Sequence, residues 1–160
     1  MHPITPSAWA KACENMSSIT ARIVREHRQL DEWMLQHQEA LIAQNLQQAQ
    51  ASYARFYELL QAHLALEDAQ LLPAHARLEK PQWRTLVYAA EHEKILQIAQ
   101  LMQQRLAQPW PPAGRDRLRW IIKMIDDERS LKNLLEHHEE REEKGLLPEL
   151  AAAEAFTSKK

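Results

Sequence analysis

The sequence predicts an all-α protein that folds as an antiparallel up-down-up-down four-helix bundle. Glycine occurs only twice in 160 residues, and a glycine-poor chain rich in alanine, leucine, glutamine and glutamate favours helices. Apolar residues recur at helical spacing through four long segments, and no stretch alternates apolar and polar residues as a half-buried strand would. Four long helices with short connections are typical of such a bundle.

Prolines, glycines and capping residues set the expected bounds of the four helices. Ser17 or Ser18 can cap the first helix, and Pro81 suits the first turn of the third. Pro73 should stop the second helix and Gly145 the fourth, because proline cannot continue a helix and glycine is common just past a helix end. The expected helices run from about 18 to 43, 45 to 72, 81 to 108 and 115 to 144, and QPWPPAG (108–114) is the one clear linker.

The chain is expected to form one domain over residues 1–160, because its length fits one domain of ordinary size. Hydrophobic residues make up 45% and charged residues 26%, a globular mixture. Residues 1–16 would be an N-terminal extension, 17–147 the bundle, and 148–160 a short helical tail.

Composition and charge exclude several classes of function. The net charge of -2 offers no basic surplus for nucleic acid, and two glycines cannot build the glycine-rich loops that hold phosphates. No apolar run approaches the roughly 18 residues of a membrane span, and the N-terminus lacks the apolar core of a signal peptide. Cys13 is the single cysteine and cannot form an internal disulfide, so we expect a cytoplasmic protein.

One eleven-residue pattern occurs twice. Residues 63–73 read HLALEDAQLLP and residues 138–148 read HEEREEKGLLP, so both run His, three residues, Glu, three residues, Leu-Leu-Pro. Each copy is preceded by a Glu-His pair, in EHRQL (26–30) and in EHEKI (91–95). The chain therefore consists of two helical hairpins of related design.

Helix geometry predicts that the repeated residues form one layer. A helix rises about 1.5 Å per residue, so in antiparallel hairpins the Glu-His sites and the His-x3-Glu sites fall at the same height. Histidine and glutamate four residues apart share a helix face. An inward layer of this kind is costly to bury unless metal ions satisfy it, and nitrogen and oxygen ligands without thiolates favour Fe or Mn, with Zn as an alternative. The candidate metal ligands are His27, His63, Glu67, His92, His138 and Glu142.

The other histidines are not expected to be ligands. We interpret His2 as uninvolved because it lies near the terminus, and His75 because it falls in a loop after Pro73. His37 and His137 are turned away from the faces that carry His27 and His138.

Asp68 and Glu91 adjoin ligand positions. Either could hydrogen-bond to a ligand from outside the metal, but we interpret both as solvated surface charges.

The four sites together resemble the hemerythrin-like, or HHE cation-binding, family over about residues 18–150. The resemblance implies a four-helix bundle with a non-haem di-iron centre, in which an oxo or hydroxo bridge joins two iron ions and Mn or Zn could substitute. It also implies the ligand sets: His27 and His63 on one iron, His92 and His138 on the other, with Glu67 and Glu142 bridging both.

The sequence departs from the oxygen-carrying members of the family at Leu96. Those proteins have a further histidine one turn beyond the third-helix ligand, where Leu96 cannot ligate. The symmetric set is more similar to bacterial members associated with repair of iron–sulfur centres and with responses to nitric oxide or oxygen. Those members usually carry an additional cysteine-bearing N-terminal segment, which Cys13 alone matches poorly.

Three functions fit these observations. The leading hypothesis is a di-iron protein that senses or responds to O2, NO or peroxide, or that handles iron. The alternatives are a di-iron enzyme, of the peroxidase, oxidase, NO reductase or iron-centre repair type, and a metal-stabilised interaction module. The expected small partner is a diatomic or peroxide ligand, and the chain is expected to be a monomer or a homodimer.

Overall fold

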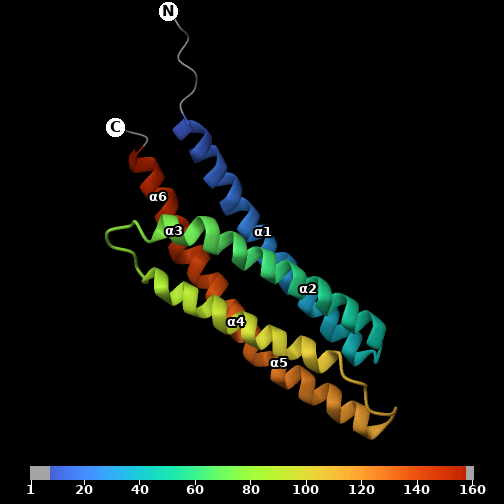
Figure 1. Ribbon diagram of the computed structural model, residues 1–160. Coiled ribbons are helices and arrows are strands. Elements are labelled where there is room, and N and C mark those ends of the chain that lie inside the picture. Colours follow the sequence, from blue (N-terminus) through green and yellow to red (C-terminus); the bar gives the residue numbers. More distant parts are fainter. Residues whose placement is uncertain (1–7, 158–160) are drawn as a thin grey trace, which may run out of the picture.

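The protein is a bundle of four long helices arranged as two antiparallel hairpins (Figure 1). The computed structural model describes the backbone of residues 8–157 and the side chains of residues 18–155, and this part of the chain contains no strand. The predicted fold class is confirmed. The helices are α1 (Ala8–Ile42), α2 (Leu46–Leu66), η1 (Glu67–Leu71), α3 (Leu72–His75), α4 (Thr85–Leu106), α5 (Arg115–Arg141), η2 (Glu142–Leu146) and α6 (Leu147–Thr157).

The first hairpin joins α1 and α2 through a tight turn. Gln44 takes the left-handed conformation with φ 57°, which lets the Asn45 N–H donate to the Ala40 carbonyl at 2.9 Å. The side chain of Asn45 then caps α2 by accepting from the Gln48 N–H at 3.1 Å. These bonds satisfy backbone groups that the two helix ends leave open.

The proline-rich linker joins α4 and α5 in the second hairpin. Its Trp110 packs against Trp120 with ring centroids 5.0 Å apart. Arg117 donates from Nε to the Pro111 carbonyl at 2.9 Å, and its guanidinium lies 6.0 Å from the Trp110 ring centroid. The linker is therefore held against the first turns of α5.

The two Leu-Leu-Pro segments do not end helices, contrary to the sequence prediction. After α2 and α5 the chain makes a wider π-turn, η1 or η2, and then continues as α3 or α6. The Leu72 N–H donates to the Glu67 carbonyl and the Leu147 N–H to the Glu142 carbonyl, five residues back. Proline has no N–H and its ring crowds the carbonyl four residues earlier, and the wider turn accommodates both effects. Gly145 likewise lies inside η2 rather than beyond a helix end.

Two helix starts also differ from the sequence prediction. The first helix begins at Ala8 rather than near Ser18. The start of α4 is Thr85 rather than Pro81, because Arg84 is extended (φ -70°, ψ 142°). The preceding turn is held from outside, since the Gln82 N–H donates to Glu149 of α6 at 2.7 Å.

Two apolar cores lie on either side of a polar layer. The larger core fills the half of the bundle near the α1–α2 turn and the α4–α5 linker, and includes Leu30, Phe56 and Leu131. The smaller core lies at the other end of the bundle, around α3 and the start of α6 (Figure 1). Both leucines of each Leu-Leu-Pro segment are buried in this smaller core, so the wider turns direct them inward: Leu71, Leu72, Leu146 and Leu147. None of the described helices is long and apolar enough to cross a membrane.

Gly145→Ala is expected to destabilise the protein, although alanine is the better helix former. An added Cβ would lie 2.9 Å from Cζ3 and 3.1 Å from Cε3 of Trp83. Overpacking costs about 1–3 kcal/mol and the gain in helix propensity is about 1 kcal/mol, so a net loss of about 1 kcal/mol is expected in thermal unfolding. In a Trp83→Leu background the same substitution should no longer destabilise, and an equal loss in both backgrounds would contradict this explanation.

Candidate metal centre

The structure brings all six sequence-predicted ligand side chains together in the polar layer between the two cores. Each of the six is at most 3% exposed. His63 Nε2 lies 2.9 Å from Glu67 Oε1, and His92 Nε2 lies 3.2 Å from Glu67 Oε2. Around the second glutamate, His27 Nε2 lies 3.3 Å from Glu142 Oε2 and His138 Nε2 lies 3.4 Å from Glu142 Oε1.

The six side chains form two overlapping groups that could each hold a metal ion. One group contains the histidines of the first hairpin and the other contains those of the second, and both share Glu67 and Glu142. Within each group the candidate ligand atoms all lie within 4.8 Å of one another. The two groups are His27, His63, Glu67, Glu142 and Glu67, His92, His138, Glu142.

When each histidine is neutral and carries its proton on the outer nitrogen, the inward atoms of this centre are all acceptors and have no hydrogen-bond partner. These are the Nε2 atoms of all four histidines and both carboxylate oxygens of Glu67 and of Glu142. Buried polar atoms left without partners cost free energy. Eight of them converging on one space is the arrangement that bound cations would satisfy, and nitrogen and oxygen donors suit Fe, Mn or Zn.

A second set of carboxylates holds the outer nitrogen of each histidine. His63 Nδ1 lies 2.9 Å from Glu26, and His138 Nδ1 lies 3.0 Å from Glu91. Because an ionised carboxylate only accepts hydrogen bonds, the proton sits on Nδ1. In the neutral ring this leaves the Nε2 lone pair facing inward, which is the form that binds a metal.

The outer carboxylates of the other two histidines come from the π-turns. His92 Nδ1 lies 2.7 Å from Asp68, which follows Glu67, and His27 Nδ1 lies 2.8 Å from Glu143, which follows Glu142. The four outer bonds therefore form a closed ring around the bundle. In this ring a carboxylate of α1 bonds a histidine of α2, and a carboxylate of η1 bonds a histidine of α4. A carboxylate of α4 then bonds a histidine of α5, and a carboxylate of η2 bonds a histidine of α1.

Asp68 is exposed, as predicted, but it also bonds His92. The interpretation of Glu91 as a solvated charge is wrong, because its side chain is 15% exposed and holds His138. The sequence analysis did not identify Glu26 and Glu143. A signal for all four was present in the repeat. Each Glu-His pair supplies the outer carboxylate as its glutamate, and each His-x3-Glu is followed by a second acid. The sequence shows a residue's own helix face but not the neighbouring helix that lies against it, so these four bonds cannot be predicted from the sequence alone.

Electrostatics at the centre favour protons when no cation is bound. Burial lowers the pKa of His27, but the carboxylates of Glu142, Glu139 and Glu143 outweigh it and raise that pKa to about 9. Burial likewise lowers the pKa of His92, and Glu142 and Glu67 raise it to about 9. Burial raises the pKa of Glu67, but the surrounding histidines hold it well below its usual range. Protons and metal ions therefore compete for the same space.

Two further histidines are buried but do not join the centre. His37 lies in the larger core, where Nδ1 donates to the Ala49 carbonyl at 2.8 Å and Nε2 lies 2.7 Å from the buried Glu128. His75 belongs to α3, not to a loop as predicted, because the chain stays helical past Pro73. Its ring lies 2.8 Å from Thr85 Oγ1 and 3.0 Å from Glu149, so it ties α3 to α4 and α6.

His137 is exposed. His2 and the side chain of Cys13 lie outside the described part of the chain.

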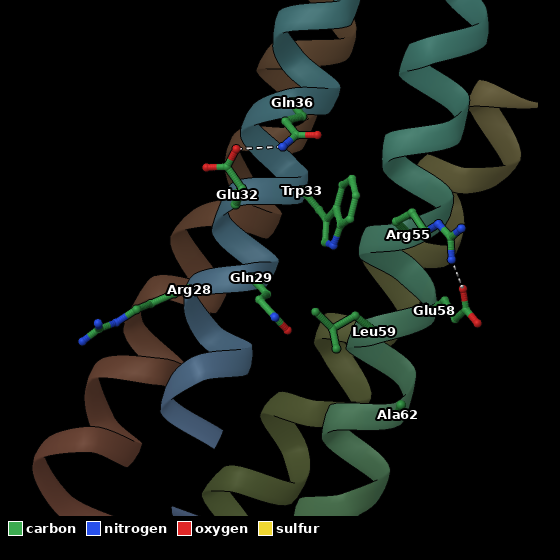
Figure 2. Close-up of a pocket in the computed structure, with 9 residues that line it drawn as sticks. All are labelled: Arg28, Gln29, Glu32, Trp33, Gln36, Arg55, Glu58, Leu59 and Ala62. Atoms are coloured by element: carbon green, nitrogen blue, oxygen red, sulfur yellow. Dashed lines mark hydrogen bonds and ion pairs between the residues drawn. The ribbon is translucent and has the colours of Figure 1, made fainter. Parts of the chain in front are cut away.

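A surface groove between α1 and α2 lies apart from the centre. Figure 2 shows Trp33 of α1 and Leu59 of α2 directed towards each other across it, with Arg55 and Glu58 paired at its rim. None of the six side chains of the centre lines this groove.

A family model described as the hemerythrin HHE cation binding domain matches residues 18–150. The match runs from α1 into α6 and includes the six side chains of the centre and the four outer carboxylates. The comparisons with curated proteins and with solved structures found no significant match.

Glu91→Gln is expected to weaken metal binding about 10- to 100-fold, the usual cost of losing a partner of a metal-bound histidine. The substitution removes the charge that holds His138 Nδ1. Metal titration of the metal-free protein with Co²⁺ would measure the affinity. Glu93→Gln is the matched control, because Glu93 lies two residues away on the same helix and is exposed. Equal affinities in the two variants would count against this role of Glu91.

The metal-free protein is expected to lose stability as the pH rises from about 6.5 to about 9. The folded-state pKa values of His27 and His92, about 9, lie above the usual 6.5. Their protonation therefore stabilises the fold fully below pH 6.5, and this contribution is lost as the pH rises through about 9. With metal bound the trend should reverse, because fewer protons compete with the ions. Thermal unfolding in chelator and in Co²⁺ would measure both trends, and a metal-free melting temperature that rises over this window would refute the expectation.

Proposed function

Because the chain belongs to the hemerythrin HHE cation-binding domain family, we propose that it is a non-haem di-iron protein that responds to O2, NO or peroxide. The observation that carries this proposal is the set of eight converging, unpartnered nitrogen and oxygen atoms at the buried centre. Their grouping into two overlapping sets supports two ions rather than one.

The proposed ligand assignment follows these two groups. His27 and His63 would hold one ion, His92 and His138 would hold the other, and Glu67 and Glu142 would be shared by both. Iron at these positions would supply reversible one-electron redox chemistry and affinity for diatomic ligands. The outer carboxylates keep a proton on each Nδ1 and fix the direction of each Nε2.

The donor count supports a reactive centre rather than a closed structural one. Two histidines and two shared carboxylates give each ion few protein donors, which leaves coordination positions for a small ligand. One turn beyond His92, Leu96 packs against the larger core and offers no further donor. The apolar residues on both sides of the layer exclude bulk water from the centre.

A metal-stabilised interaction module is a second candidate, favoured by the outer ring of hydrogen bonds. The ring passes through all four long helices and both π-turns, so ion binding acts on every part of the bundle at once. In such a module, occupancy would act on a partner through the folding of the bundle.

Protein purified without oxygen is expected to contain about two iron ions per chain, matching the two candidate groups. His138→Ala should lower the iron content by at least half, because His138 belongs to one of those groups. His137→Ala is the matched control, since His137 is its exposed neighbour. Iron analysis with thermal unfolding of the metal-free variants measures the effect. Wild-type protein without metal, or equal iron content in both variants, would disprove a di-iron centre.

Optical spectra distinguish the reactive protein from the module. Spectra of the iron-loaded protein would be recorded under anaerobic, aerobic and NO-treated conditions. We expect changes in the near-ultraviolet and visible range on exposure to O2 or NO. A large fall in melting temperature on chelation, without a spectral response to either gas, would favour the module.

A further inference from the structure

The internal repeat breaks on one side of the centre. The residue after His63 is Leu64, whereas the residue after His138 is Glu139. Both side chains are buried, Leu64 at 1% and Glu139 at 8% exposure. Leu64 packs into the larger core, but Oε1 of Glu139 has no hydrogen-bond partner. One half of the centre therefore has an apolar neighbour where the other has an unpartnered carboxylate.

The same difference recurs one turn from the Glu-His sites. Four residues after His92 stands Leu96, whereas four residues after His27 stands Asp31. Leu96 is half-buried against the larger core, but Asp31 is exposed. A third pair of equivalent positions also has a neutral residue on one side and an acid on the other. Gln61 lies two residues before His63, and Glu136 lies two residues before His138.

The acidic members of these pairs lie along one interface, between α1 and α5. Asp31 and His27 share a face of α1, and Glu136 and Glu139 share a face of α5. Glu143 follows them in η2. The bond between His27 and Glu143 shows that these two faces meet. Asp31 interacts electrostatically with Glu136 and Glu143, and Glu139 interacts with Asp31 and His27.

Exposure falls along this interface towards the centre. Asp31 and Glu136 are exposed, Glu139 is buried, and His27 lies at the centre itself. Lys132 and the imidazole of His27 are the positive groups that act on Asp31. The four carboxylates outnumber them, so a cation would meet carboxylate oxygens from the surface inward.

We propose that Asp31, Glu136 and Glu139 form the path by which a divalent cation reaches the metal centre, passing between α1 and α5. The proposal rests on the di-iron function proposed above. Neighbouring charges of one sign raise the local concentration and the association rate of the opposite ion. The spare oxygen of Glu139 serves as a temporary ligand, so the ion exchanges its water shell for protein donors in steps. On the other side of the centre, Leu64 and Leu96 offer no such donor.

Residues along such a path change the rates at which the ion binds and dissociates, but not its equilibrium affinity for the centre. The same carboxylates assist the ion inward and outward, so uptake and release should slow by the same factor when one is removed. A ligand of the bound ion would instead change the dissociation constant and the spectrum of the bound metal.

The test measures Co²⁺ uptake by the metal-free full-length protein after rapid mixing, followed by the absorption of bound cobalt. Glu139→Gln is expected to slow uptake about tenfold or more, within the range for electrostatic steering. Release to a chelator should slow equally, with unchanged equilibrium affinity and cobalt spectrum. The uptake rate of the wild type should fall with ionic strength more steeply than that of the variant.

Two further variants keep the test decisive. Glu140→Gln is the matched control, because Glu140 is the exposed neighbour of Glu139, and it should leave uptake unchanged. The double variant Asp31→Asn with Glu136→Gln alters only exposed positions and should slow uptake in the same direction, to a smaller extent.

Three results would overturn the path. In the first, Glu139→Gln and the double variant both take up Co²⁺ as fast as the wild type. In the second, Glu139→Gln binds Co²⁺ more weakly and changes the cobalt spectrum. In the third, Glu140→Gln slows uptake as much as Glu139→Gln does. Wild-type protein that takes up no metal would instead refute the di-iron function, so the two failures are distinguishable.

Discussion

The buried layer of four imidazoles and two carboxylates is the constraint on which the rest of the structure depends. Polar groups without partners are expensive in an apolar interior, and this layer has an apolar core on each side. The helices satisfy its outer half themselves, through the four bonds at Nδ1. The inner half is left to protons or to metal ions, so the state of the centre and the stability of the bundle are linked.

The π-turns make this layer possible. Each begins at the glutamate that belongs to both ligand groups and continues with the acid that holds a histidine of the next helix. The extra residue in the turn then directs both leucines of the Leu-Leu-Pro segment into the smaller core. π-turns are rare and often occur at functional sites. Here one turn connects an inward carboxylate, an outward carboxylate and the adjoining core.

The two halves of the centre are alike where metal ions would bind and different around them. The repeat keeps the same candidate donors in both hairpins, and an outer carboxylate at each equivalent position. Beyond these, Leu64 and Leu96 close one side, while Glu139 and Asp31 make the other side acidic. In the proposed di-iron protein, this difference would separate two requirements: holding two ions equally, and exchanging them with solvent from one direction.

The sequence by itself determined the fold class and indicated six candidate metal ligands, because helical periodicity and the spacing within each repeat depend on residues close in the chain. Only the tertiary structure decided which carboxylates hold which histidines, because each outer bond joins different helices. The same holds for His75, whose partners Thr85 and Glu149 come from two other helices. Leu-Leu-Pro predicts an interruption of the regular helical hydrogen bonds, because proline has no N–H. Packing decided whether the helix ends there or continues through a wider π-turn, since burying both leucines in the smaller core stabilises the continued helix.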